Sequence, residues 1–120
     1  MGGLAPNVAG ALAYLLGPVT GILFLVLEKE NRFVRFHAAQ STGLSVAWIV
    51  FWIITSVLSA ALSVVPVVGF LVSILMLFVS LILGLGGLVL WLYLMYQAFN
   101  GNEWEIPYIG EQSRKILLGG

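Results

Sequence analysis

Three long apolar runs, separated by short polar segments, set the pattern of this chain. The first, at residues 8–27, contains no charged side chain and has the length of about 20 residues that a helix needs to cross a bilayer. Pro18 lies near its middle and removes a backbone donor, which predicts a kink. Small residues recur at every fourth position and let another helix approach closely. They are Ala9, Ala13, Gly17 and Gly21.

The second and third runs, at about residues 39–64 and 67–99, are divided by the turn signal of Pro66 and Gly69. As one helix the third run would measure about 50 Å, which exceeds the hydrocarbon core, so we expect it to tilt or to kink near Gly84 and Gly87. A turn at these glycines is the alternative, and it would give four spans. It would also leave a last helix too short to cross and an unpaired turn in lipid. The sequence therefore predicts an all-α membrane protein with three transmembrane helices in one domain over residues 1–120.

Composition agrees with this pattern. The chain is 61% apolar and only 8% charged, against a usual charged share of about 25%. A soluble fold of this size cannot bury that much apolar surface, so we expect the lipid bilayer to be its solvent. The formal net charge is zero, which makes a nucleic-acid partner implausible.

The basic residues predict the orientation. They follow either the first run or the third, and they are Lys29, Arg32, Arg35, Arg114 and Lys115. With three spans these two segments share one side, which the positive-inside rule assigns to the cytoplasm. We therefore expect a multi-pass protein of the cell membrane with its N-terminus outside and its C-terminus in the cytoplasm. The tail is predicted to lie at the interface, with a short helix at 111–118.

No residue pattern indicates catalysis. The chain has no cysteine and a single histidine, which cannot build a transition-metal site alone. Its serines lack a partnering histidine and carboxylate, and Glu103 and Glu105 have no nearby base or nucleophile. The apolar runs contain no charged residue of the kind that proton relays and ion-coupled pumps use. We therefore predict no catalytic residue, no metal, no cofactor and no enzymatic activity.

A few polar residues are candidates for a functional cluster. With three spans, the start of the second and the end of the third lie at the same cytoplasmic depth. The residues concerned are His37, Gln40, Ser41, Gln97 and Asn100. Because polar groups in lipid need partners, we expect Gln40 to contact Gln97. Interhelical hydrogen bonds in membranes contribute only ~0.6 kcal/mol on average, so such a cluster would fix register more than add stability.

One motif resembles a known family. Phe33, Arg35, Phe36, His37 and Gln40 follow the first run, and Gly101, Pro107 and Gly110 follow the third. This arrangement is similar to that of small prokaryotic multi-pass membrane proteins of unknown function. That family is distantly similar to the Tic-twenty-type chloroplast import component. The resemblance implies a multi-pass membrane fold and no particular activity.

Two functional hypotheses remain. The first is a non-enzymatic interaction or assembly unit that forms a homo-oligomer or joins a larger membrane complex. Its expected helix-packing residues are Ala13, Gly17, Gly21, Gly69, Ser73, Ser80, Gly84 and Gly87. The alternative is a passive channel or a protein-translocation-related component formed by an oligomer, suggested by the serine- and threonine-rich second run.

Overall fold

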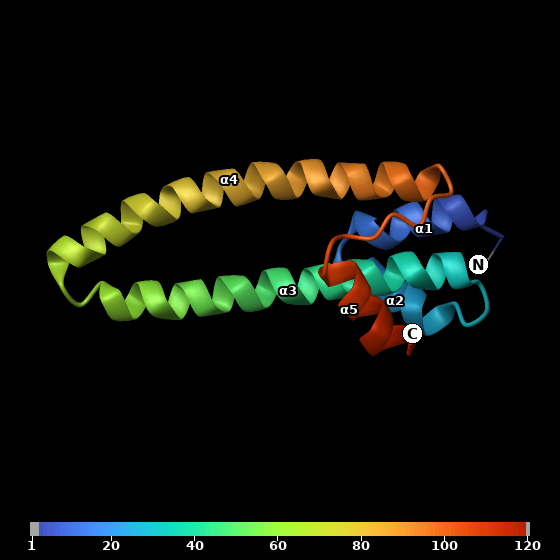
Figure 1. The fold of residues 1–120 in the computed structure, drawn as a ribbon, viewed down its shortest axis with the longest axis horizontal. Helices are drawn as coiled ribbons and strands as arrows, with labels where there is room; N and C mark the ends of the chain where they lie inside the picture. The colour runs from blue at the N-terminus through green and yellow to red at the C-terminus, as the bar shows by residue number, and fades with distance from the viewer. Residues whose placement is uncertain (1–2, 120) are drawn as a thin grey trace. The chain divides into compact units, whose positions relative to one another are not determined.

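The computed structural model describes residues 3–119, and every regular element in that range is an α-helix (Figure 1). The helices are α1 (Pro6–Leu15), α2 (Pro18–Leu27), α3 (Arg32–Leu62), α4 (Pro66–Phe99) and α5 (Ile109–Leu118). The chain divides into two compact units. The first, called the terminal unit here, combines the chain up to Ala47 with the chain from Trp91 onward. The second, called the hairpin unit, is Trp48–Leu90. Both α3 and α4 contribute to each unit.

The first apolar run is two helices, so the prediction of one span at 8–27 is wrong. Between α1 and α2, Gly17 has φ +59° and ψ −118°, a conformation that suits glycine. Pro18 begins α2, where its missing N–H is tolerated, so the expected kink is a complete break. A helix of 10 residues is about 15 Å long, half of the ~30 Å needed to cross the hydrocarbon core.

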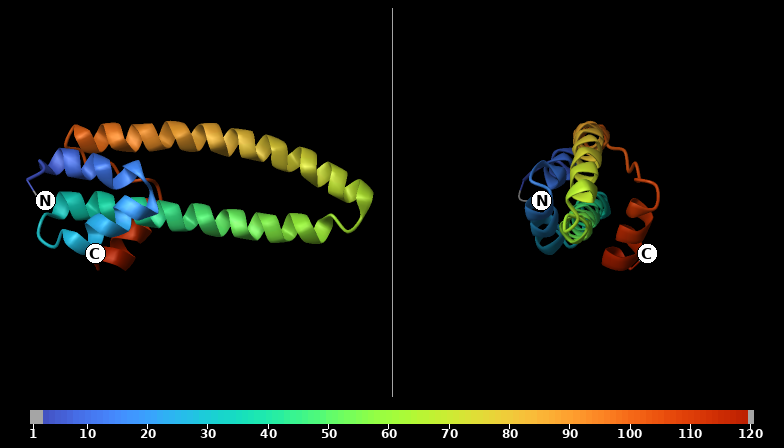
Figure 2. Two further views of the ribbon diagram at one scale, coloured as in Figure 1. Left: turned by 180° about the vertical axis from the view of Figure 1, so that it is seen from behind. Right: turned by 90° about the vertical axis from the view of Figure 1, so that its left-hand side faces the viewer.

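Within the terminal unit, α1 and α2 pack against each other as an antiparallel pair (Figures 1 and 2). At the open end of the pair, the Asn7 side chain donates a hydrogen bond to the Phe99 carbonyl at 2.9 Å. The guanidinium of Arg35 donates to the carbonyls of Leu25 and Glu28, which closes the end of α2. The bond from Asn7 places the start of α1 beside the end of α4.

The hairpin unit contains the apolar parts of α3 and α4. Both helices are long and apolar enough to cross a bilayer. Because α4 continues unbroken through Gly84 and Gly87, the preference for one long third helix is confirmed over a turn there. The two helices meet closely where Gly87 lies against Trp48. Large apolar side chains point outward along both, as at Ile82, which is 69% exposed.

The predicted helix in the tail is present as α5. It packs on the start of α3 through its buried Gly110 and Ser113, and Ser113 lies against Gly43. An ion pair joins Arg114 to Glu105 at 3.0 Å. The ammonium of Lys115 hydrogen-bonds Glu111 on the helix surface and lowers the pKa of that carboxyl group. This part of the tail is therefore a docked element of the terminal unit.

Candidate functional site: a buried polar network

A polar network lies at the centre of the terminal unit. His37 and Gln40 are one turn apart on α3 and therefore share a face, which is turned toward Tyr14 of α1. All three side chains are at most 1% exposed. Burying polar groups this deeply is unfavourable unless each has a hydrogen-bond partner. The way in which these groups find partners determines what the site can do.

Gln40 uses its amide to join three parts of the chain. Its Nε2 donates to the Tyr14 hydroxyl at 2.8 Å and to the Trp104 carbonyl at 3.0 Å. Its Oε1 accepts from the backbone N–H of Ile106 at 2.8 Å. The neighbouring groups fix the amide orientation, because Trp104 offers only an acceptor and Ile106 only a donor. One side chain thus ties α1 and the segment after α4 to α3.

The hydrogen bonds of His37 define its protonation state. Its Nε2 lies 2.9 Å from the carbonyl oxygen of Asn102, which accepts only, so Nε2 carries a hydrogen. Its Nδ1 lies 2.6 Å from the Tyr14 hydroxyl, which already accepts from Gln40. Among the hydrogen-bond partners of the Tyr14 hydroxyl, only Nδ1 can accept its hydrogen, so we assign the O–H as donor to an unprotonated Nδ1. The imidazole is neutral with both nitrogens engaged, which leaves no lone pair for a metal and no proton free for transfer.

Aromatic rings and glycines enclose this network. The ring of His37 meets those of Tyr14, Phe33 and Phe36 edge-on, at centroid distances of 5.3, 4.7 and 5.0 Å. Gly110 of α5 lies directly against Oε1 of Gln40, so a β-carbon at this position would collide with it. Polar groups that are tightly enclosed and fully hydrogen-bonded are typical of a site that holds helices together.

A second polar group of contacts closes the break between α1 and α2. Pro18 has no N–H to offer the Tyr14 carbonyl, which accepts instead from the Gly17 N–H at 3.2 Å and from the indole of Trp91 on α4 at 2.7 Å. Thr20 links both sides of the break, because its hydroxyl donates to the Ala13 carbonyl and accepts from the Leu16 N–H. Ser41 of α3 donates to the Gly17 carbonyl at 3.1 Å. The break is thereby satisfied by protein groups.

The predicted polar cluster is brought together only in part. His37 and Gln40 do share one network, but none of the hydrogen bonds in the described part of the chain joins Gln40 to Gln97. Gln97 accepts instead from the Asn102 side chain at 2.8 Å, and Asn100 donates to the Tyr96 carbonyl on its own helix. Ser41 serves the break at Gly17. In place of the expected partner, the segment after α4 turns back over α3 and supplies backbone partners to Gln40.

The motif residues gather around this network in the terminal unit. Phe33 and Phe36 touch His37, and Arg35 closes α2. Gly101, at φ +79°, allows the turn after α4. Gly110 fits under Gln40, and the Pro107 carbonyl accepts from the Ile109 N–H at the start of α5. Sequence reasoning missed the roles of the Tyr14 hydroxyl, the Trp91 indole and the carbonyls of residues 102 and 104. Only the position of Tyr14 four residues before Pro18 pointed to an unpaired carbonyl.

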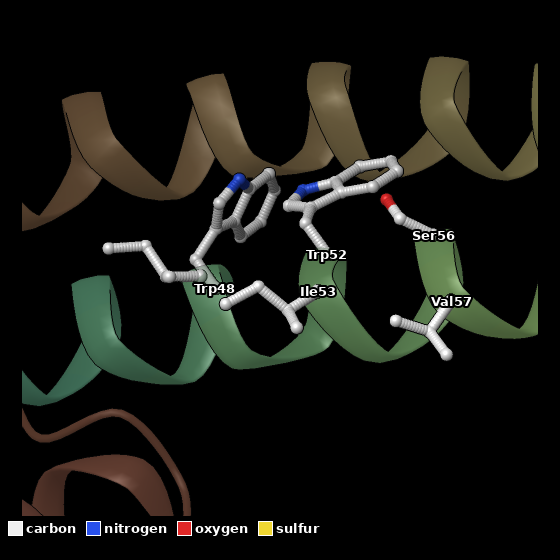
Figure 3. A pocket seen from close by; sticks show the side chains of 6 residues that line it. Trp48, Trp52, Ile53, Ser56 and Val57 are labelled. Atoms are coloured by element: carbon white, nitrogen blue, oxygen red, sulfur yellow. The ribbon is translucent and has the colours of Figure 1, made fainter.

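A shallow apolar groove lies elsewhere, in the hairpin unit. It is lined by Trp48, Ile49, Trp52, Ile53, Ser56 and Val57, all on α3. The two indoles point toward α4 (Figure 3), and their centroids are 6.4 Å apart. Gly87 provides the space that Trp48 fills. The groove therefore reflects how two large rings pack between the helices.

Comparison with known proteins identifies the family. A UPF0132 membrane protein of Archaeoglobus fulgidus is 47% identical over 115 residues, which cover 94% of this chain and 96% of the relative. The chain belongs to the UPF0132 membrane protein family. Two UPF0132 membrane proteins of Methanocaldococcus jannaschii are 40% and 34% identical. Their alignments cover 91% of this chain in each case, and 86% and 68% of the respective relatives.

Residues 4–112 also match the family described as the magnetosome magnetite crystal formation protein family. No solved structure matches the chain. The UPF0132 relatives are named as membrane proteins, so the prediction of a membrane protein from a small prokaryotic family is confirmed. The findings show no link to the chloroplast import component.

Proposed function

We propose that this UPF0132 protein is a non-enzymatic assembly unit of the cell membrane. In this proposal α3 and α4 cross the bilayer, and the terminal unit forms a rigid body that positions them. The observation that carries it is the network of Tyr14, His37 and Gln40, which ties α1, α3 and the chain after α4 together. Fully satisfied buried networks rigidify a fold, which suits a role in architecture.

The side chains of the network support a structural role over a chemical one. His37 has both nitrogens in hydrogen bonds, and the amide of Gln40 has a partner on each polar atom. A reaction at this site would first have to break bonds that hold the unit together. The same holds for Glu105 and Glu111, whose carboxylates are paired with Arg114 and Lys115. The description of the matching family names magnetite crystal formation. For this chain we propose only an architectural role, in which it holds membrane helices in place.

The hydroxyl groups of the long helices also favour assembly over a channel. Thr55 on α3 and Ser63 directly after it donate to α3 carbonyls one turn earlier, and Ser73 does the same on α4. A hydroxyl bonded to its own backbone is compatible with lipid and does not require water. The serine-rich character of α3 is thus accounted for without an aqueous path.

We expect two or more copies to associate through a side face of α4. Ser73, Ser80 and Gly84 are exposed and share this face, and a β-carbon at Gly84 would meet open space. They lie about 100° around α4 from Val72 and Val79, which are partly covered. Small residues on an open face let another transmembrane helix approach closely.

Cysteine cross-linking tests this association, because the natural chain has no cysteine. Gly84→Cys should form disulfide-linked dimers in native membranes under mild oxidation. Ile82→Cys is the matched control, since Ile82 is also exposed but lies on the opposite side of α4. Equal cross-linking at both positions, or a monomer only on blue-native gels, would contradict the proposed face. Ion flux through liposomes containing the pure oligomer would support a channel instead.

A further inference from the structure

We propose that α1 and α2 form a re-entrant membrane hairpin. This hairpin is distinct from the hairpin unit, Trp48–Leu90. It enters the hydrocarbon from one face, turns at Gly17, and returns to the same face. Its outer surface contacts lipid acyl chains. The protein then crosses the bilayer twice, through α3 and α4, and its N-terminus, the segment at 28–31 and its C-terminus share one side. This inference does not depend on the assembly proposal.

Contacts along the hairpin establish its direction. At the open end, Asn7 bonds to Phe99, the last residue of α4. At the closed end, the carbonyl of Tyr14 bonds to Trp91, eight residues earlier on the same helix. Eight residues of helix correspond to about 12 Å. The tip therefore lies about 12 Å along α4 from the end of that helix, in the direction of Pro66.

The outer surface of the hairpin has the chemistry of a lipid contact. Its exposed side chains include Leu15, Leu16, Val19, Ile22, Leu23 and Val26. Leu16 and Val19, beside the turn, are 61% and 63% exposed. Charged residues are absent from residues 8–27. In water this surface would be a hydrophobic patch with no cover, whereas acyl chains solvate it without cost.

The polar groups at the turn supply an independent argument. Irregular backbone at membrane depth is tolerated only where protein groups satisfy it, because hydrocarbon offers no hydrogen bond. Here the Tyr14 carbonyl accepts from the Gly17 N–H and from Trp91, and the Gly17 carbonyl accepts from the Gly21 N–H and from Ser41. Thr20 serves the Ala13 carbonyl and the Leu16 N–H. The polar groups of the turn are therefore satisfied within the protein, as a turn in hydrocarbon requires.

The basic residues remain consistent with this topology. With two crossings, Lys29 and Arg32 lie at the open end of the hairpin, on the same side as Arg114 and Lys115. The positive-inside rule still assigns this side to the cytoplasm. What changes is the N-terminus, which moves from the outside to the cytoplasmic side.

Thiol labelling of single-cysteine variants of the full chain tests the topology. A membrane-impermeant maleimide should label Ala5→Cys, Lys29→Cys and Lys115→Cys from the same side of sealed vesicles. It should label Val64→Cys, in the turn between α3 and α4, only from the other side. Inverted and right-side-out vesicles together give both orientations. Labelling of Ala5→Cys together with Val64→Cys would restore three crossings and overturn the proposal.

A spin label tests the lipid contact. Leu16→Cys carrying a nitroxide should collide with oxygen, which concentrates in acyl chains, more than with a water-soluble nickel complex. Lys29→Cys is the control, and the nickel complex should reach it more readily. Nickel accessibility at Leu16 equal to that at Lys29 would place the turn in water and refute the hairpin.

Discussion

Replacing Gln40 by leucine should destabilise the terminal unit strongly. Leucine has a similar size, so the change removes hydrogen bonds with little change in packing volume. It leaves the Ile106 N–H and the Trp104 carbonyl without their side-chain partner, while the Tyr14 hydroxyl keeps its bond to His37. An unpaired buried polar group costs about 1–3 kcal/mol. Two such groups predict a loss of about 2–6 kcal/mol in the free energy of unfolding.

The matched control is Gln97→Leu. Gln97 makes an exposed hydrogen bond to the Asn102 side chain, whose loss water can replace, so we expect a cost of at most about 1 kcal/mol. Both free energies can be measured by titrating mixed micelles with sodium dodecyl sulfate and following tryptophan fluorescence. Gln40→Leu should also speed tryptic cleavage after Arg114 and Lys115, because the chain after α4 loses its attachment. Equal destabilisation by the two variants would refute the central role of Gln40.

Three further outcomes are expected. Gly110→Ala should displace α5 and accelerate tryptic cleavage of the tail, since its methyl group would collide with Gln40 and Glu105. Gly84→Ala is the control, because a methyl group there meets open space and should leave cleavage unchanged. Unchanged cleavage in Gly110→Ala would contradict the docking of α5. Trp91→Phe should lower the free energy of unfolding by about 0.5–1.5 kcal/mol, because the Tyr14 carbonyl loses its indole partner and keeps only the Gly17 N–H, and an unaffected denaturation curve would argue against the indole bond. The ¹⁵N spectrum of His37 should show Nδ1 unprotonated and Nε2 protonated. The opposite tautomer would disprove the assigned directions of the hydrogen bonds to Tyr14 and Asn102.

Hydropathy and helix length were sufficient to predict the two long helices. No proline interrupts residues 67–99, so α4 forms one helix, and Pro66 lies at its first position. The resemblance carried by Phe36, His37 and Gln40 led to the correct prokaryotic family. Neither result required knowledge of long-range contacts, because both depend on residues close together in the sequence.

The first apolar run shows where local reasoning fails. The sequence revealed that Pro18 deprives the Tyr14 carbonyl of a donor, and this allows either a kink or a break. The choice depends on the contacts of the folded turn, where the nearby Gly17 N–H and the distant Trp91 both bond to that carbonyl. Hydropathy cannot distinguish one span from two half-length helices with the same composition.

The sequence by itself determined that this is a membrane protein, that its long helices are α3 and α4, and that its basic residues follow the first and third apolar runs. Those properties follow from apolar length and charge, which are additive along the chain. The tertiary structure decided that the first run folds back on itself and that Gln40 binds the chain after α4. Its partners there are backbone atoms of Trp104 and Ile106. Every residue carries such atoms, so no sequence pattern can single them out.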